Sequence, residues 1–185
     1  MASLRPRQPS PRPSQPAFSR DRVNALWVTD ITEHPTREGK VYCAAVLDTY
    51  SRRIVGWSID SSPNAALVTN ALSMAIDNRG EVAGTVIHSD KGTQFGSWAF
   101  TQRAKASGLL PSMGSVGDCY YNGLMESFWS RIQVQLLDRQ RWTTRLESAN
   151  AIFDYLEICH NRQRRHSALG YLSPIEFENR SIPVA

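Results

Sequence analysis

The sequence contains no long hydrophobic run and very little cysteine. None of its apolar stretches approaches the roughly 18 to 20 residues that a helix needs to cross a bilayer, and its first twenty residues lack the apolar core of a signal peptide. The three cysteines, Cys43, Cys119 and Cys159, lie far apart and form no C-x-x-C pair. Such isolated thiols fit a reducing cytoplasm better than a disulfide framework or a zinc site. We therefore expect neither export nor contact with a membrane.

Most of the chain has no net charge. The 185 residues carry a net charge of +4, but residues 1–22 hold five arginines and one acid, so sixteen basic and sixteen acidic side chains are left in the remainder. Five prolines and four serines in the first twenty residues predict that 1–22 is a disordered tail or linker. A basic tail of this kind suits contact with phosphates, and a solvated linker is the alternative.

Residues 23–180 have the pattern of one α/β domain. Short apolar or alternating stretches predict strands at 25–31, 41–48, 53–60, 85–90 and 109–113. Apolar residues at helical spacing predict helices at 63–80, 96–107, 124–137 and 147–160. Asn122 is placed to cap the third of these helices. Short connections make the first three strands an antiparallel meander, and the order of elements predicts a mixed sheet with helices on its faces.

Three carboxylates in this pattern suggest a site. Asp30 and Asp90 each end an apolar strand, where open α/β sheets build their sites, although either one alone fits a simple turn aspartate. Glu126 lies on the polar side of an amphipathic helix, together with Asn122, Ser130 and Gln133. If the three carboxylates converge, their mutual repulsion favours a bound divalent cation, and oxygen-only ligands favour Mg²⁺ or Mn²⁺. Two such ions, roughly 3.5–4 Å apart, can activate the attacking oxygen and stabilise the leaving oxygen in phosphodiester displacement.

The motifs around these carboxylates identify a family resemblance. They are W-V-T-D-I-T at 27–32, H-S-D-K-G-T-Q-F at 88–95 and N-G-L-M-E-S-F-W at 122–129, and 35 residues separate Asp90 from Glu126. Together with H-N-R-Q-R-R-H-S-A-L-G-Y-L-S-P-I-E-F at 160–177, they resemble the catalytic core of integrases and bacterial insertion-sequence transposases, over about residues 24–178. The resemblance implies a ribonuclease H-like fold, with a five-stranded mixed sheet flanked by helices on both faces. It also implies that Asp30, Asp90 and Glu126 form a catalytic triad that binds two metal ions.

Further polar residues are candidates for contact with DNA. They are Lys91, Gln94, Asn122, Ser130, Gln133, Arg162, Arg164 and Arg165. For the loop residues the alternative is a solvated surface, and for the arginines it is pairing with Glu147, Asp154 and Glu157. His88 shares one side of its strand with Asp90, so it either borders the site or packs within the sheet. The sequence departs from the family at Tyr121, where relatives often have aspartate, and at Gln133, where they often have lysine or arginine.

The resemblance implies cleavage of a DNA strand, then joining of the freed 3′-hydroxyl to a target phosphodiester. We therefore expect the catalytic core of a DNA transposase, a Mg²⁺- or Mn²⁺-dependent polynucleotidyl transferase that acts on element ends and target DNA. Two alternatives are a ribonuclease H-like nuclease and a non-catalytic module that assembles with full-length transposase. We further expect a homo-oligomer in the bacterial cytoplasm, associated with the nucleoid. Full-length relatives have helix-turn-helix modules before the core, whereas here an Arg/Pro/Ser tail precedes it.

Overall fold

The structure, a computed structural model, describes residues 21–114 and 118–181, and it describes no side chains for 118–121. The expected tail, 1–22, lies outside these ranges except for its last two residues. Five strands form one mixed sheet in the order β3-β2-β1-β4-β5. The first three strands pair antiparallel, whereas β4 is parallel to both β1 and β5. Their bounds are β1 Leu26–Thr36, β2 Gly39–Asp48, β3 Ile54–Asp60, β4 Val86–Ser89 and β5 Leu110–Met113.

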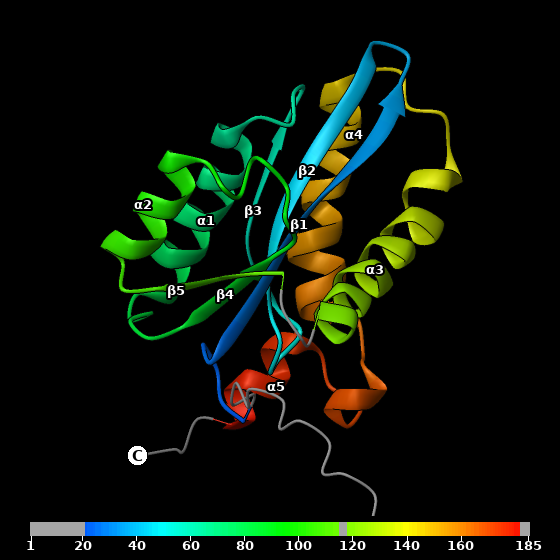
Figure 1. Cartoon of the computed structure of the whole chain (residues 1–185). Coiled ribbons are helices and arrows are strands. Elements are labelled where there is room, and N and C mark those ends of the chain that lie inside the picture. The colour runs from blue at the N-terminus through cyan, green and yellow to red at the C-terminus, as the bar shows by residue number, and fades with distance from the viewer. Residues whose placement is uncertain (1–20, 115–117, 182–185) are drawn as a thin grey trace, which may run out of the picture.

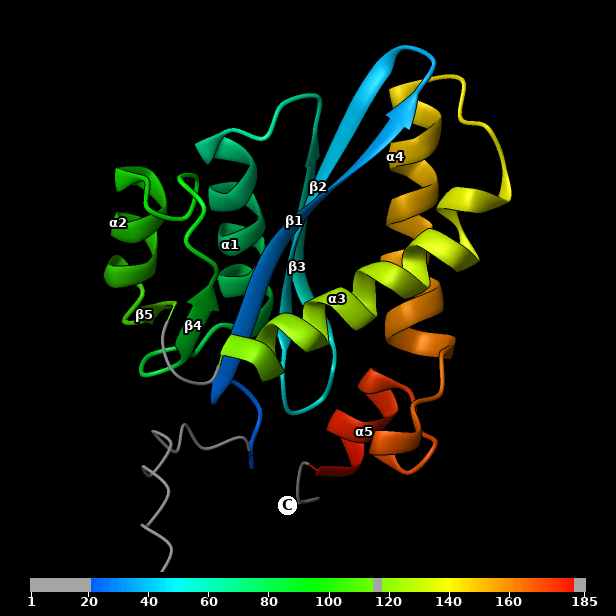
Figure 2. The same ribbon diagram turned by 45° about the vertical axis from the view of Figure 1, so that its right-hand side comes forward.

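Helices cover both faces of this sheet (Figure 1). On one face lie α1 (Ala65–Arg79) and α2 (Trp98–Ala106). On the other face lie α3 (Asp118–Gln135) and α4 (Arg145–Asp154), and the nine-residue π-helix η2 (Tyr155–Gln163) continues directly from α4 (Figure 2). The short elements η1 (Leu137–Arg139), η3 (Ser167–Leu169) and α5 (Pro174–Ser181) complete the chain. The predicted mixed five-stranded sheet with helices on both faces is confirmed.

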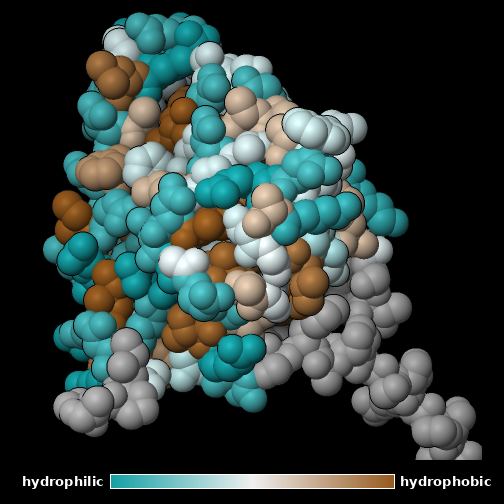
Figure 3. All heavy atoms as spheres, turned by 90° about the vertical axis from the view of Figure 1, so that its left-hand side faces the viewer, coloured by the Kyte–Doolittle hydropathy of each residue, from teal (hydrophilic) through white to brown (hydrophobic). Residues whose placement is uncertain are grey.

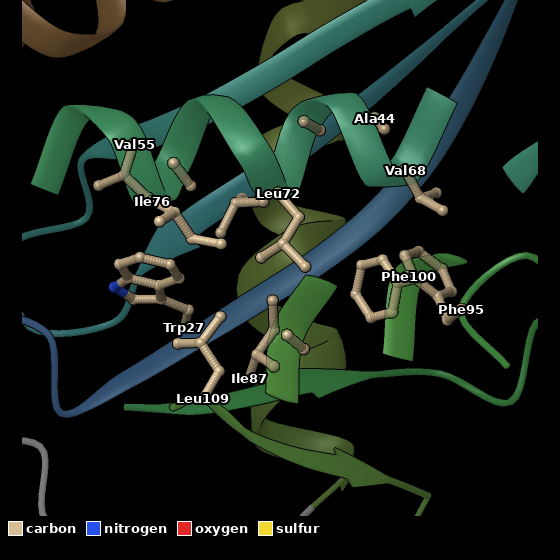
Figure 4. Packing of buried hydrophobic residues seen from close by; sticks show 14 of the residues in the cluster. Trp27, Ala44, Val55, Val68, Leu72, Ile76, Ile87, Phe95, Phe100 and Leu109 are labelled. Carbon is tan, nitrogen blue, oxygen red and sulfur yellow. The ribbon is translucent and has the colours of Figure 1, made fainter. Parts of the chain in front are cut away.

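The sheet separates two hydrophobic layers because successive side chains of a strand point to opposite faces. Trp27, Ile87 and Val55 pack against Leu72 and other residues of α1 (Figure 4). On the opposite face the strands pack against α3 and against the continuous helical segment formed by α4 and η2. The buried residues of that layer include Leu26, Val28, Cys43, Ala45, Leu47, Met125, Phe128, Ile132, Ile152 and Leu156. Alternation along β1 therefore turns position 30 toward α3.

The outer surface beyond α1 and α2 has a mixed character. Hydrophobic residues on this face are interspersed with hydrophilic ones (Figure 3), and the large exposed side chains of α2 and β5 are Trp98, Leu110 and Met113. Scattered exposure of this kind is normal for a folded surface. Within the described residues, no helix is long and apolar enough to cross a membrane.

β3 and α1 approach so closely at Gly56 that no side chain fits between them. A methyl group on Gly56 would collide with the carbonyl oxygen of Ala71 and lie 2.5 Å from the backbone nitrogen of Ala75. We predict that Gly56→Ala lowers the free energy of unfolding by about 1 to 3 kcal/mol, the usual cost of overpacking. Urea denaturation measures this change. Gly123→Ala in α3 is the matched control, because nothing lies within 4 Å of that position, and it should not destabilise.

Two predicted helix boundaries are wrong. The helix expected at 124–137 begins at Asp118, so Asn122 lies inside α3 and is not its N-cap. The helix expected at 147–160 begins at Arg145, after Thr144 caps it by accepting a hydrogen bond from the backbone N–H of Glu147 at 3.0 Å. That helix gives way to the π-helix η2 after Asp154.

The C-terminal segment is attached to the sheet by buried polar side chains. The Asn161 amide in η2 accepts a hydrogen bond from the backbone nitrogen of Ile54 and donates one to its carbonyl oxygen, each at 2.9 Å. In α5, the Glu178 carboxylate accepts hydrogen bonds from Ser51 Oγ at 2.6 Å, from Arg53 at 2.7 Å and from Arg79. These contacts connect residues about one hundred positions apart, and they fix η2 and α5 against the β2–β3 turn.

Candidate active site

The first two carboxylates of the expected triad emerge from neighbouring strands. β1 and β4 are parallel, and Thr29 in β1 lies opposite Ser89 in β4. Asp30 is the next residue of β1, and Asp90 directly follows the last residue of β4. The strand register therefore sets Asp30 and Asp90 side by side where β4 ends. In α/β sheets, the carboxyl ends of parallel strands are the usual place for a binding site.

Glu126 reaches the same place from α3. A cavity of about 150 Å³ lies between β1, β4 and α3, and Asp30, Asp90, Glu126 and Asn122 all line it. The remaining lining residues are Val28, Thr29, His88 and Met125. Asp30 is half-buried, whereas Asp90 and Glu126 are exposed. The structure thus brings the three carboxylates together around one pocket. Their catalytic and metal-binding roles stay a prediction.

The pocket contains carboxylate oxygens that could bind a metal ion, but these oxygens do not form a complete coordination site. Within residues 21–114 and 118–181, no group of three or more His, Cys, Asp and Glu side chains is arranged to hold a metal ion. Asp90 Oδ1 accepts a hydrogen bond from the backbone N–H of Gly92 at 2.9 Å. Asp30 nevertheless feels the negative charges of both Asp90 and Glu126, and a cation between them would relieve this repulsion. The donor set fits Mg²⁺ or Mn²⁺ once the side chains rotate toward one another.

Trp129 is a contact of the site that the sequence pattern missed. Its indole N–H donates a hydrogen bond to Asp30 Oδ2 at 3.0 Å, while the ring packs against the apolar layer beneath α3. Burial raises the pKa of Asp30, hydrogen bonds from the Ile31 backbone and from Trp129 oppose the rise, and the charges of Asp90 and Glu126 add to it. By helical spacing, Trp129 falls on the apolar side of the predicted amphipathic helix, away from its polar residues. The available signal was its N–H, because a buried indole usually needs an acceptor.

We predict that Trp129→Phe raises the pKa of Asp30 further, because phenylalanine keeps a ring but removes the N–H that stabilises the carboxylate. Because a cation requires the ionised form, Mn²⁺ affinity should begin to fall at a higher pH in the variant than in the wild type. Carboxyl ¹³C NMR of the metal-free protein measures the first effect, and Mn²⁺ titrations at several pH values measure the second. Trp98→Phe, at an exposed site in α2, is the control. An Asp30 titration unchanged in Trp129→Phe would contradict this role.

A second hollow extends the site beyond the two aspartates. It has a volume of about 250 Å³ and shares Asp30 and Asp90 with the first cavity. Gln94, one of the expected DNA contacts, lines it and donates a hydrogen bond to the carbonyl oxygen of Pro63 at 3.0 Å. Lys91 is exposed, and its side chain lies against Gly114. Gln94 therefore borders the region of the carboxylates, and Lys91 is the residue that follows Asp90 in the chain.

The residues of α3 that were proposed for DNA contact lie at different distances along the helix from the carboxylate pocket. Asn122 lines the pocket of the carboxylates, and Ser130 is exposed about one turn beyond Glu126. Gln133 lies further along, and its amide donates a hydrogen bond to Asp138 Oδ1 at 2.5 Å. His88 is buried in β4 and lines the same pocket, with Nδ1 3.4 Å from Ser112 Oγ. The polar strip of α3 thus leads away from the pocket toward η1.

The C-terminal arginines lie apart from the three carboxylates. Arg164 and Arg165 line a different cavity, on the neighbouring side of α3, and Arg162 is exposed on η2. The pairing considered from the sequence is not found, because none of the ion pairs within the described segments involves Glu147, Asp154 or Glu157. Glu157 accepts a hydrogen bond from the indole N–H of Trp57 at 2.8 Å.

Comparison with known sequences agrees with this fold and these motifs. A family model described as integrase core domain matches residues 20–119, and a second model with the same description matches 107–174. The chain therefore belongs to the integrase core domain family. It is similar to the insertion element IS600 uncharacterized 31 kDa protein of Shigella sonnei, with 37% identity over 163 residues, or 88% of this chain and 60% of that protein.

A second relative is the transposase for insertion sequence element IS904 of Lactococcus lactis subsp. lactis (strain IL1403). It is 35% identical over 161 residues, or 87% of this chain and 64% of that transposase. The chain thus spans less than two thirds of the length of either relative.

A solved structure shares the fold. The HTLV-2 integrase catalytic core domain in complex with magnesium, in its dimeric form, superposes with a TM-score of 0.57 at 17% sequence identity, covering 83% of this chain and 94% of that domain. The likeness establishes the ribonuclease H-like architecture that the sequence predicted.

Proposed function

We propose that this chain is the catalytic core of a DNA transposase that cleaves and joins phosphodiester bonds. The observation that carries the proposal is the convergence of Asp30, Asp90 and Glu126 around one pocket. Membership of the integrase core domain family and similarity to an insertion-sequence transposase support it. We assign residues 23–180 to this core and residues 1–22 to a basic tail. Its partners would be DNA at the element ends and at the target, and a second copy of the chain.

Asp30, Asp90 and Glu126 would hold two Mg²⁺ or Mn²⁺ ions. When bound, such ions neutralise phosphate charge and lower the pKa of an attacking hydroxyl. The residues of the chain would position the metal-binding carboxylates. The parallel register fixes the two aspartates, Trp129 orients the Asp30 carboxylate through its N–H, and α3 sets Glu126 opposite them. Lys91 and Gln94 beside Asp90, and Asn122 beside Glu126, would contact the phosphates that flank the scissile bond.

The test is an assay of strand cleavage and joining. The full chain is incubated with supercoiled plasmid and labelled duplex DNA in Mg²⁺ or Mn²⁺, with EDTA as the metal-free control. We expect nicked and joined products only with metal, and no cleavage of a labelled RNA–DNA hybrid. Cleavage of the hybrid would indicate a ribonuclease instead. Absence of any DNA product together with absence of Mn²⁺ binding in calorimetry would contradict the proposal.

A further inference from the structure

A cavity separate from the two at the carboxylates lies on the neighbouring side of α3. Its volume is about 220 Å³, and it is enclosed by α3, the β2–β3 turn and the chain from His160 to Ala168. None of its lining residues lines the pocket of the three carboxylates. In Figure 2, two of these three segments can be followed, namely α3 in green to yellow and the orange segment that follows η2. The proposed active site makes no use of this cavity.

The charge of the cavity is of one sign. Four arginines line it, namely Arg52, Arg131, Arg164 and Arg165, and no acidic residue does. Arg165 is partly balanced, because its guanidinium lies 3.6 Å from Glu176 and donates a hydrogen bond to the carbonyl oxygen of Tyr171. Within the described segments, none of the ion pairs includes Arg131 or Arg164, and Arg164 donates a hydrogen bond to the neutral amide of Gln135.

Arg131 is held in an unfavourable electrostatic setting. Partial burial lowers the pKa of its guanidinium, and the nearby positive charges of Arg164 and Arg52 lower it further. Both effects disfavour the charged form that arginine keeps at neutral pH. An anion between these side chains would offset the repulsion, and guanidinium groups are well suited to phosphate because their N–H groups match its oxygens.

Two buried histidines provide a second, independent sign of a binding site. His160 and His166 both line the cavity and are more than nine-tenths buried. His166 Nε2 has no hydrogen-bond partner within the described residues, whereas His160 Nε2 lies 2.8 Å from the carbonyl oxygen of Arg52. Burial holds the pKa of His160 at about 3 and that of His166 at about 4, so both rings are neutral near pH 7. A buried ring nitrogen normally has a partner, and a neutral imidazole N–H can donate to a phosphate oxygen.

We propose that this cavity binds a backbone phosphate of DNA, held by Arg131 and Arg164 and by the N–H of His166. The assignment rests on the proposed function, since it assumes that the ligand running along α3 is a DNA strand. Ser127 lines the cavity and Glu126 lines the carboxylate pocket, and neighbouring helix residues lie about 100° apart around the axis. A strand anchored here would thus pass beside the helix face that carries Glu126. The anchor would position the DNA without reading its sequence.

The experiment measures DNA binding without chemistry. Fluorescence anisotropy with a labelled duplex in EDTA gives the affinity of the wild type and of Arg131→Gln/Arg164→Gln, across about 50 to 200 mM salt. The double variant should bind at least about tenfold more weakly, because it loses charge-assisted hydrogen bonds. Its plot of log affinity against log salt should be shallower by about 0.9 for the phosphate contact that is lost. Lys105→Gln/Arg180→Gln removes the same charge at exposed sites on α2 and α5, and it should lose clearly less.

Two results would overturn the proposal. They are an unchanged salt slope in Arg131→Gln/Arg164→Gln and an equal loss in the control pair. Calorimetry with inorganic phosphate tells whether the cavity binds a phosphate of the DNA backbone or a free phosphate ion. If the double variant loses phosphate binding but keeps DNA binding, the cavity serves a free anion and the assignment to DNA is wrong. Because the assay needs no metal, failure of strand cleavage with intact binding would affect only the proposed function.

Discussion

Replacing Asp90 with asparagine should abolish metal-dependent strand cleavage and joining, with a loss of at least about two to three orders of magnitude in rate. The substitution removes one of the three negative charges that line the pocket and keeps the size of the side chain. Asparagine can still accept the hydrogen bond that the Gly92 N–H donates to Asp90 Oδ1, so the loop should keep its conformation. Affinity for Mn²⁺, measured by calorimetry, should fall together with the rate.

DNA binding should respond in the opposite sense. Loss of a negative charge beside the DNA path should leave the affinity measured in EDTA unchanged or slightly higher. The matched control is Asp60→Asn at the end of β3, because that carboxylate also ends a strand and accepts a hydrogen bond from the following backbone N–H. The control should retain full activity. Retention of activity by Asp90→Asn would reject the assignment of the triad.

The largest expected loss of stability follows from Glu178→Gln. Glu178 is buried, and its carboxylate accepts hydrogen bonds from Ser51, Arg53 and Arg79. Neutralising it leaves the nearly buried Arg79 with Asp48, 3.5 Å away, as its remaining ion-pair partner. Breaking a buried network on one side should lower the free energy of unfolding by about 3 to 5 kcal/mol. Urea denaturation at neutral pH measures this change.

The pH dependence gives a second measure of the same contact. Burial alone would raise the pKa of Glu178, but the hydrogen bonds and charges of Arg79, with Ser51 and Arg53, lower it below its ordinary value of 4.5. The contribution to stability is therefore fully present above about pH 4.5 and is lost as the pH falls through the lowered pKa. The difference between wild type and Glu178→Gln should shrink in acid. Glu81→Gln, at an exposed site, should change stability little at any pH.

The elements that the sequence predicted best are those with local signals. Alternating and apolar stretches located the strands, and Gly80 and Gly108, both at positive φ, mark the ends of the first two helices. The start of α3 was missed because Asn122 resembles a cap, whereas the helix continues N-terminally to Asp118. The meeting of Asp30 with Asp90 was expected from strand ends alone, and the observed register explains it.

Contacts across about one hundred residues were beyond reach of the sequence pattern. Asn161 lies in the motif at 160–177, whose arginines were interpreted as a DNA surface, and Glu178 directly follows that motif. Both side chains hold the C-terminal segment against the β2–β3 turn. Helical periodicity contains no sign of the π-helix η2, because the change of spacing depends on what its side chains contact. The hydrogen bond from Trp129 to Asp30 was missed for the same reason.

The pairing of Thr29 with Ser89 limits how this fold can change in length. Inserting or deleting one residue in β1 before Asp30, or in β4 before Asp90, would turn that carboxylate to the side of the sheet that α1 and α2 cover. The loops at 61–64 and 80–85 carry no such restriction, since they lie outside the paired strands. Insertions tolerated by functional variants should therefore collect in these loops, and the two strands should keep a constant number of residues.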